Sequence, residues 1–476
     1  MGYEKRIPEL VEQKRDIFID ANDQIWAFAE PRFQEVKSAK LLAEILEKEG
    51  FKTTWGLGGA DTAFVCEWGS GKPVVGFLGE YDSLSGLSQQ ADIAVHTPVE
   101  AGGQGHGCGH NTLGAGSASA AVALKDYMQE KGLKGTLRFY GCPAEENAGG
   151  KAFMVRDGAF DDCDIAITWH TGTYTAIMPT GMLANFRVFY TFHGTSAHAA
   201  GSPHLGRSAL DAVEIMNVGV NYMREHMISE ARVHYAVTDT GGTAPNVVQS
   251  RAQVLYAMRA PSVTDVKDLK RRIDNIAKGA ALITETAVDI KQVSAYTNYL
   301  SNAVAEAEMR KYMHELFPTL TYTDEEYAYL QKFKDVTPAA DINNYRGMVQ
   351  QYLGLKGSEL EEHMKQPISD VLFEKTGKGS GSTDVGDVSW VVPTTQCFVS
   401  SYSMGCTGHS WLETAQGKSS IVHKGMFYAS KVMALTGLSF IEDPTLVEKA
   451  KAALLEQLDG QVYESPLPEG YKPEIW

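Results

Sequence analysis

The chain has 476 residues, of which 43% are hydrophobic and 21% are charged, and its formal net charge is −16 at pH 7. These values are typical of a globular protein with a sizeable buried core, and the length predicts two to three domains. The acidic charge disfavours a nucleic-acid partner, which requires a basic face. The sequence contains neither the roughly 18 consecutive apolar residues of a membrane span nor the apolar core of a signal peptide at its start, so no membrane partner is expected.

Six cysteines are spread along the chain without a paired framework: Cys66, Cys108, Cys142, Cys163, Cys397 and Cys406. That distribution predicts reduced thiols and a cytoplasmic protein. Two of them, Cys142 and Cys397, lie in strand-like runs, where a small buried side chain is expected.

The first part of the chain, residues 1–184, alternates helical and strand-like patterns. Apolar residues recur with helical spacing over residues 9–29 and 33–49, and strand-like runs cover residues 62–68 and 74–79. This alternation predicts an α/β domain in which helices layer a mixed sheet.

The sequence Gly-His-Gly-Cys-Gly-His-Asn covers residues 105–111 and holds a thiol, Cys108, two residues from an imidazole, His110. A helix is predicted to begin here, with Asn111 as its cap. Soft, basic side chains held this close are typical of a transition-metal site. The alternative is a tight turn in which a cysteine and two histidines coincide, because motifs this short recur by chance.

Two adjacent carboxylates, Glu145 and Glu146, follow the strand-like run 135–141 and precede two glycines. At the end of a strand, one carboxylate can bind a metal ion while the other transfers protons, and a divalent ion lowers the pKa of a water between them. The pair therefore indicates a reaction site and not a solvated surface.

Two histidines repeat this placement farther along the chain. His170 follows the buried strand-like run 164–169, and His409 follows the run 395–399 after a short interval. Because open α/β sheets bind ligands beyond the carboxyl ends of their strands, we expect both histidines to lie at one edge of the sheet with the two earlier motifs.

Residues 185–300 have a different rhythm, in which predicted strands and helices follow the order β-α-β-β-α-β. The predicted elements cover residues 186–192, 208–223, 232–238, 254–259, 266–278 and 287–293. This order is that of a small ferredoxin-like α+β domain.

Residues 301–476 return to α/β patterns and are expected to complete the sheet of residues 1–184 around the inserted domain 185–300. The segment 377–386 is rich in Gly and Ser and predicts a loop near the site. The polar, proline-containing tail after Asp459 predicts an exposed extension.

Taken in order, these motifs resemble those of the dinuclear-metal M20 peptidases and amidohydrolases, in the branch where a Cys-Gly-His motif supplies two ligands. The resemblance rests on the stretches GHGCGHNTLGAGSASAA, PAEENAGGKAFMV and GSTDVGDVSW and extends from about Ala21 to about Leu435. Within the family, these stretches are most similar to the subgroup that hydrolyses p-aminobenzoyl-glutamate. The resemblance implies a zinc-exopeptidase-like catalytic domain with an inserted lid that mediates dimerisation.

The resemblance also implies the roles of individual residues. Five positions match the family's metal ligands and would hold two divalent ions per chain, zinc or manganese: Cys108, His110, Glu146, His170 and His409. Glu145 matches the general base that takes a proton from the attacking water and later protonates the leaving amine. Asp82 matches the carboxylate that orients a metal-binding histidine. The family usually has Asp where Glu80 stands.

Three polar residues of the lid match family positions that contact the substrate. His198 resembles the histidine that reaches across a dimer and stabilises the negative charge of the tetrahedral intermediate, and Asn246 resembles a second such donor. Arg259 resembles the arginine that clamps a substrate carboxylate. From the residues alone, His198 could instead cap a helix, Asn246 could fix a turn and Arg259 could pair with an acid of the lid.

The implied activity is metal-dependent hydrolysis of the amide bond of an N-acyl amino acid, with p-aminobenzoyl-glutamate as the leading substrate. A dipeptidase or a general aminoacylase of the same fold is the first alternative. The second alternative is the partner subunit of a heteromeric hydrolase, although such a subunit would not need an intact set of ligands and base. The expected partners are a small-molecule substrate and a second copy of the chain, in a homodimer or higher homo-oligomer, or a related subunit in a heteromer.

Overall fold

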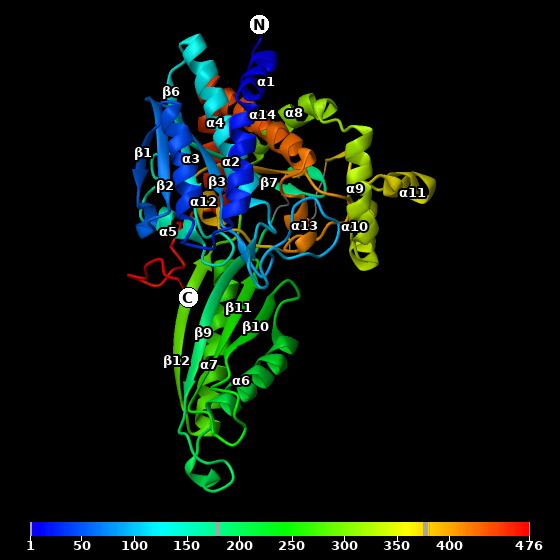
Figure 1. Cartoon of the computed structure of the whole chain (residues 1–476). Coiled ribbons are helices and arrows are strands. Elements are labelled where there is room, and N and C mark those ends of the chain that lie inside the picture. Colours follow the sequence, from blue (N-terminus) through cyan, green and yellow to red (C-terminus); the bar gives the residue numbers. More distant parts are fainter. Residues whose placement is uncertain (1, 178–180, 375–378, 380, 476) are drawn as a thin grey trace.

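Two separate sheets organise the structure, one of eight strands and one of four (Figure 1). A computed structural model describes residues 2–177, 181–374, 379 and 381–475. Of the predicted loop 377–386, residues 377, 378 and 380 lie outside the described residues.

The eight-stranded sheet has the order β1-β2-β6-β3-β7-β14-β8-β13. Its strands are β1 (Lys52–Trp55), β2 (Phe64–Ser70), β3 (Val74–Glu80), β6 (Gly135–Cys142), β7 (Ile165–Gly172), β8 (Thr175–Ile177), β13 (Leu372–Phe373) and β14 (Thr394–Ser400). The four central strands β6, β3, β7 and β14 are mutually parallel. Every residue of β3 is buried, as expected for a parallel strand that is covered on both faces.

Helices cover both faces of this sheet, which confirms the α/β fold class expected from the sequence. One core lies under α1 (Tyr3–Gln13), α2 (Arg15–Phe28), α3 (Val36–Lys48), α4 (His110–Lys131), α8 (Ala303–Leu316) and α14 (Ser420–Glu442). The opposite core lies under α5 (Gly150–Arg156) and α12 (Val385–Val391).

Helix α4 is pressed against the sheet, and two of its glycines make this approach feasible. A Cβ atom on Gly114 would lie 2.8 Å from the carbonyl oxygen of Glu80, and one on Gly116 would lie 2.8 Å from the ring of Trp169. Because of this close packing, the first residue of α4, His110, lies beside the carboxyl end of β3.

The predicted single helix over residues 9–29 is wrong, because the structure divides it into α1 and α2 at Lys14. Lys14 leaves the helical region, with φ −111° and ψ 16°. Its ammonium group pairs with Glu49 and Asp126, so contacts from distant segments fix the corner.

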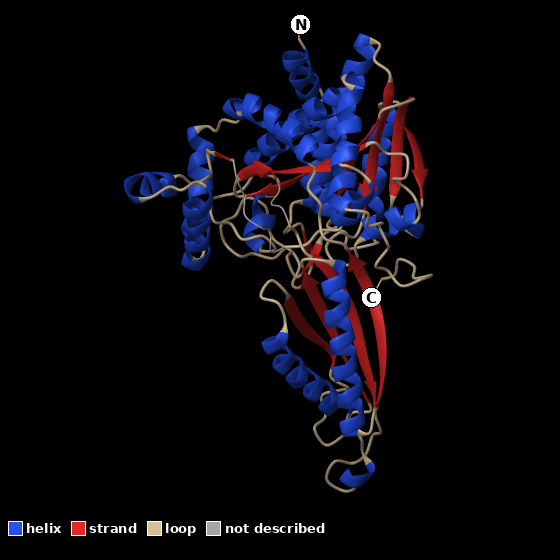
Figure 2. Cartoon of the chain, turned by 180° about the vertical axis from the view of Figure 1, so that it is seen from behind, coloured by secondary structure: helices blue, strands red, loops and turns tan. Residues whose placement is uncertain are grey.

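The four-stranded sheet and its two helices form the lid, which projects from the larger domain (Figure 2). The sheet is antiparallel, with the order β10-β11-β9-β12. In chain order the elements are β9 (Ala184–His193), α6 (Ala209–Met223), β10 (Arg232–Asp239), β11 (Arg251–Ala260), α7 (Val263–Thr284) and β12 (Ala287–Tyr296). The order β-α-β-β-α-β is the one expected, while the exact domain limits at 184/185 and 300/301 stay a prediction.

The remaining elements surround the sheet edges and connect the two domains. They are the ribbon of β4 (Leu84–Ser85) and β5 (Gln104–Gly105) and the helices α9 (Asp324–Val336), α10 (Ala339–Tyr352), α11 (Gly357–Lys365), α13 (Trp411–Gln416) and α15 (Pro444–Leu458), with short 3-10 turns η1 (Leu57–Gly59), η2 (Pro203–Leu205), η3 (Arg224–His226) and η4 (Phe317–Thr319). Within the described residues, no helix combines the length and apolar character needed to cross a membrane.

The tail after Asp459 is not the exposed extension that its composition predicts. Tyr463 donates a hydrogen bond to Asp387 at 2.7 Å, and Gln292 of β12 donates to the carbonyl of Pro466 at 2.9 Å. Leu467 is buried in the core of the lid. The tail therefore joins the larger domain to the lid.

Candidate metal centre

The four motifs singled out from the sequence meet at one edge of the large sheet. Glu145 and Glu146 follow β6, His170 lies near the end of β7, and His409 follows β14. Since β6, β3, β7 and β14 are parallel neighbours, their carboxyl ends lie side by side. The lid projects from this edge, because Arg187 of β9 donates to the carbonyl oxygen of Glu146 at 3.0 Å.

The candidate metal ligands form two groups that share one thiol. The ligand atoms of one group lie within 4.8 Å of one another, and this group consists of Cys108, His110 and His170. The second group meets the same limit and consists of Cys108, Glu146 and His409. In the first, Cys108 Sγ lies 3.5 Å from His170 Nε2. In the second, His409 Nε2 lies 3.4 Å from Glu146 Oε2. The structure thus brings together all five residues that the sequence proposes as ligands.

The turns that carry these residues use unusual backbone conformations. Gly109, between Cys108 and His110, has φ +70°, and a Cβ atom on it would lie 2.3 Å from the Thr171 hydroxyl oxygen. The turn therefore requires glycine. Ala144 and His409 adopt φ values of +59° and +58° although they are not glycines. Such conformations persist where surrounding contacts enforce them, and they cluster at functional sites.

Hydrogen bonds aim the histidine rings into the site. His110 Nδ1 lies 2.8 Å from Asp82 Oδ1, and the other oxygen of Asp82 accepts from the backbone N–H of Glu146 at 3.0 Å. His170 Nδ1 lies 2.7 Å from the carbonyl oxygen of Thr171. Both rings therefore present Nε2 to the centre, which is the arrangement by which outer carboxylates and carbonyls orient metal ligands.

Two buried polar atoms at the centre lack hydrogen bonds within the described residues: His110 Nε2 and Glu146 Oε1. Unsatisfied buried polar atoms are costly unless something binds them. Two ligands on one ion, each at about 2.0–2.3 Å, lie roughly 3.0–3.6 Å apart, and the measured separations of 3.4 and 3.5 Å fit this range. The sulfur, nitrogen and oxygen donors suit divalent transition-metal ions.

Burial and crowding of carboxylates shift the protonation equilibria of this site. Burial, with Glu80, Asp384 and Glu146 nearby, raises the pKa of Glu145 well above its usual range. Burial lowers the pKa of His170 to about 4, so its ring is neutral at pH 7, which is the form that binds a metal ion. The excess of negative charge is the condition under which bound cations stabilise a buried site.

Sequence reasoning missed three charged residues at this centre. The buried Glu35 accepts a hydrogen bond from the backbone N–H of Ala144 at 2.9 Å and from the Thr62 hydroxyl at 2.9 Å. Lys151 pairs with Glu80, and Glu413 is buried near Cys108, whose thiol pKa its charge helps to raise after burial and Glu146. Glu413 follows His409 by four residues and could have been noticed, whereas nothing in the local sequence marks Glu35.

The lid residues are divided between its two ends. Arg259 of β11 lies opposite Asn185 at the start of β9, beside the larger domain. His198 and Asn246 lie beyond the other end of the sheet, about 30 Å away along β9, where Ala199 N–H donates to the carbonyl of Asn246 at 3.0 Å. The structure therefore brings His198 and Asn246 together but holds both far from the metal ligands of the same chain (Figure 1).

Local hydrogen bonds select the tautomer of His198. Its Nδ1 accepts from the backbone N–H groups of Ala200 at 3.2 Å and Gly201 at 3.1 Å. A neutral imidazole has one protonated nitrogen, so the proton must lie on Nε2. His198 is exposed and thus presents an N–H donor to whatever approaches it.

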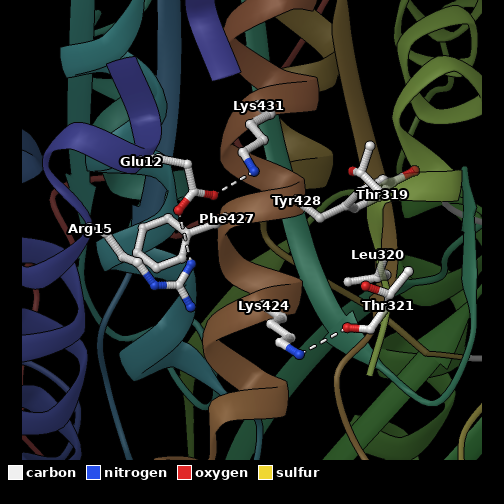
Figure 3. A pocket seen from close by; sticks show the side chains of 9 residues that line it. All are labelled: Glu12, Arg15, Thr319, Leu320, Thr321, Lys424, Phe427, Tyr428 and Lys431. Atoms are coloured by element: carbon white, nitrogen blue, oxygen red, sulfur yellow. Dashed lines mark hydrogen bonds and ion pairs between the residues drawn. The ribbon is translucent and has the colours of Figure 1, made fainter. Parts of the chain in front are cut away.

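A second cavity, of about 330 Å³, lies between the α1–α2 corner, α14 and the segment after η4 (Figure 3). Its lysines already have partners, because Lys431 pairs with Glu12 at 2.6 Å and Lys424 donates to the carbonyl of Thr321 at 2.9 Å. None of the site residues proposed from the sequence, all of which are described, lines this cavity. It is therefore separate from the metal centre.

Comparisons with known proteins agree with this geometry. The model of peptidase family M20/M25/M40 matches residues 76–460. One of the two kinds of subunit of the p-aminobenzoyl-glutamate hydrolase of Escherichia coli (strain K12) is 42% identical over 98% of this chain and 98% of that protein. The Xaa-Arg dipeptidase of Mus musculus is 26% identical over 93% of this chain and 90% of that protein. A Bacillus subtilis structure, described as a dinuclear metal binding peptidase from the M20 family, has the same fold, with a TM-score of 0.56 at 15% identity over 90% of this chain and 99% of that chain.

Proposed function

This chain belongs to peptidase family M20/M25/M40, and we propose that it hydrolyses the amide bond between an aromatic acyl group and an amino acid, with p-aminobenzoyl-glutamate as its substrate. The family expected from the sequence is confirmed, and membership makes the chain a metal-dependent amidohydrolase. One observation carries the proposal: Glu145 lies at the strand-end edge where two ligand groups share Cys108.

Five residues would hold two divalent ions, with the thiolate of Cys108 common to both ions. Ions bound there would polarise the amide carbonyl and lower the pKa of the attacking water. A thiolate and three imidazoles favour zinc, whereas the carboxylate oxygens also admit manganese, so both metals suit the donor set.

Glu145 is the proposed general base and acid. It accepts the proton of the attacking water and then delivers that proton to the leaving nitrogen, so that a neutral amine departs. Both transfers are efficient when the pKa of the carboxyl lies closer to the working pH than its usual value. The burial that raises the pKa of Glu145 supports this role. Asp82, through His110 Nδ1, keeps a proposed ligand in place.

The substrate carboxylate is the proposed partner of Arg259. The guanidinium Nε of Arg259 is buried and has no hydrogen-bond partner within the described residues. A planar guanidinium binds a carboxylate with two parallel hydrogen bonds. Arg259 lies at the end of the lid beside the larger domain, which supports contact with a substrate held at the strand-end edge.

We further propose a homodimer in which each lid completes the partner's site. The edge strand β10 exposes residues 234–238, and Tyr235, Val237 and Tyr222 of the neighbouring α6 are 42%, 42% and 69% exposed. An exposed apolar edge of this kind favours pairing with another chain. If two copies pair by a two-fold axis, with their β10 strands antiparallel, the far end of one lid lies beside the near end of the other.

In such a dimer, the partner's His198 would donate its Nε2–H to the oxyanion of the tetrahedral intermediate. The local hydrogen bonds that leave Nε2 protonated support this assignment. Asn246, which lies beside His198, would supply a second donor.

Two alternatives are favoured by particular comparisons. The similarity to an Xaa-Arg dipeptidase supports a dipeptidase, which requires a free amino terminus on its substrate. The name of the Escherichia coli relative describes a subunit, which supports a heteromer with a related chain. We also propose a cytoplasmic protein, because all six cysteines lie in the described part of the chain and none of them is in a disulfide.

The test is hydrolysis of p-aminobenzoyl-glutamate by the purified single chain. The chain is stripped of metal with a chelator, reloaded with zinc or with manganese, and assayed for glutamate, with Glu145→Ala as the control. We expect release of glutamate that needs metal and disappears in the variant. Absence of release from a chain that still binds two ions would contradict the substrate.

A panel of substrates then separates the alternatives. N-aroyl and N-acetyl amino acids test an aminoacylase, and dipeptides with free amino termini test a dipeptidase. Activity that appears only after addition of a related chain would support the heteromer.

A further inference from the structure

A lysine is fully buried beside the metal centre. Lys151, at the start of α5, has no exposed surface. Its Nζ atom lies 2.6 Å from Glu80 Oε1 and 2.7 Å from Asp384 Oδ1. Asp384 also accepts from the backbone N–H of Lys151 at 2.9 Å, so both ends of the lysine are held.

The charges of this cluster do not balance. One ammonium group faces two carboxylates, Glu80 and Asp384, and the side chains of all three are at least 96% buried. An unpaired buried charge is costly unless a counter-charge lies close by. Asp384 has both oxygens engaged by Lys151, whereas Glu80 has only Oε1 engaged by it. The excess negative charge therefore lies on the Oε2 side of Glu80.

The Oε2 atom of Glu80 points at the proposed metal centre, 3.3 Å from His110 Nε2. The opposite ring nitrogen of His110 is bound to Asp82, so Nε2 is the atom left for a metal ion. A separation of 3.3 Å falls within the roughly 3.0–3.6 Å expected for two donors on one ion. Glu80, His110 and Glu145 also form a group whose donor atoms all lie within 4.8 Å of one another.

We propose that Glu80 is a further oxygen ligand of the ion held by His110, and that Lys151 is the positioning residue that aims its carboxylate. The inference rests on the metal centre proposed above and adds a ligand to it. One consequence is that the two ions are unequal, because the ion beside His110 gains a hard oxygen donor that the ion beside His409 lacks. Harder donor sets favour manganese relative to zinc.

The test is metal binding by the metal-free chain without substrate. The parent and the Glu80→Gln variant are titrated with cobalt and with zinc, and the bound metal is measured by elemental analysis and competition with a chelator. In Glu80→Gln, we expect the affinity for one of the two ions to fall by about 10–100-fold and that for the other to stay unchanged. The thiolate-to-cobalt absorption band should persist because Cys108 is intact.

Asp164→Asn is the matched control. Asp164 is also a buried carboxylate paired with a lysine, Lys451, but it precedes β7 at the opposite edge of the sheet. It should bind both ions as the parent does. Equal binding of both ions by Glu80→Gln and the parent would overturn the proposal.

Lys151→Met tests the positioning role. We expect it to weaken the same ion, and the double variant with Glu80→Gln to be no weaker than Glu80→Gln alone, because Lys151 acts through Glu80. Additive losses would overturn that role. Should Lys151→Met fail to fold, a crystal structure of the zinc-loaded parent decides: Glu80 Oε2 within about 2.2 Å of an ion supports the ligand, and a distance above about 3 Å overturns it.

These measurements do not depend on the substrate. A chain that fails to cleave p-aminobenzoyl-glutamate but loses one ion in Glu80→Gln would contradict the proposed substrate and support the ligand. A chain that cleaves it but binds both ions unchanged in Glu80→Gln would do the reverse.

Discussion

The metal centre and the far end of the lid carry the two halves of the proposed reaction site, and they are built in opposite ways. At the metal centre the chain itself orients the donors, since Asp82 holds His110 and the carbonyl of Thr171 holds His170. At the far end of the lid, His198 and Asn246 are exposed, and local contacts fix only the tautomer of His198.

The difference follows from the cost of burying charge. A buried cluster of carboxylates and imidazoles must have its partners within the same folded chain, because unpaired buried charges destabilise the fold. An exposed histidine stays solvated at little cost until a partner covers it. The metal centre therefore depends on folding, and the lid end depends on association of two chains.

The largest effect should separate the two adjacent carboxylates of the metal centre. Glu145→Gln removes the proposed proton carrier, and we expect kcat to fall about 10³-fold or more while both ions stay bound. Glu146→Gln removes a proposed ligand, and we expect it to lose metal as well as activity. Steady-state kinetics combined with elemental analysis checks both. Loss of metal from Glu145→Gln would contradict the division of roles.

A smaller loss is expected at the lid. His198→Ala should reduce kcat by about 10²–10³-fold, the range for one oxyanion donor, without change in metal content. If the histidine acts across a dimer, mixing His198→Ala with Glu145→Gln chains creates hybrid dimers with one intact site. Unfolding and refolding the mixture should restore up to about a quarter of parent activity.

Two outcomes would break the comparison between the regions. No recovery from the mixture would mean that the lid does not serve a partner's site. Val237→Lys, which charges the exposed edge of β10, should give monomers with full metal content and the low activity of His198→Ala. Active monomers would contradict the shared site, and sedimentation at several concentrations measures the assembly.

The sequence predicted the fold and gathered the candidate ligands because both follow from local patterns. Each motif follows a strand of one parallel set, so the order of elements alone brings Cys108, Glu146, His170 and His409 to one edge. The pairing of chains across the lid stays a prediction, because one chain shows only the exposed edge that would take part.

The residues that support this edge could not be predicted in the same way. Lys151 meets Asp384 across 233 positions of the chain, and Glu35 meets Ala144 across 109. No periodicity or spacing signals such contacts, because only the packed structure creates them. The corner at Lys14 has the same origin, since its partners Glu49 and Asp126 come from other helices.

Glu35 offers an intermediate effect within the metal centre. Its carboxylate holds the N–H of Ala144, whose left-handed conformation sets the direction of Glu145. Glu35→Gln should lower kcat about 10-fold through misplacement of the base, with KM and metal content unchanged. Glu326→Gln is the control, because Glu326 is also buried but caps α9 far along the chain. Equal losses of kcat in both variants would show that Glu35 acts only on stability.

The smallest effect lies at the seam between the two regions and concerns stability. Asp387 is buried and accepts hydrogen bonds from Thr297 N–H, just after the last lid strand, at 3.0 Å and from Tyr463 of the tail at 2.7 Å. Burial raises its pKa from 3.8 to about 7. The folded chain thus keeps a proton that the unfolded chain has already lost between pH 4 and 7, and its stability falls as the pH rises through that range, by at most ~4 kcal/mol.

Asp387→Asn removes this titration while an amide oxygen still accepts from Thr297. The Tm of the variant minus that of the parent should therefore increase between pH 5.5 and pH 8.5, measured on metal-free protein so that ligand protonation is common to both chains. A difference that stays constant with pH would mean that Asp387 does not carry a proton in the fold. In that case the charge at the junction of lid, tail and sheet must be stabilised by a cation, and the seam would share the cation dependence of the metal centre instead of standing apart from it.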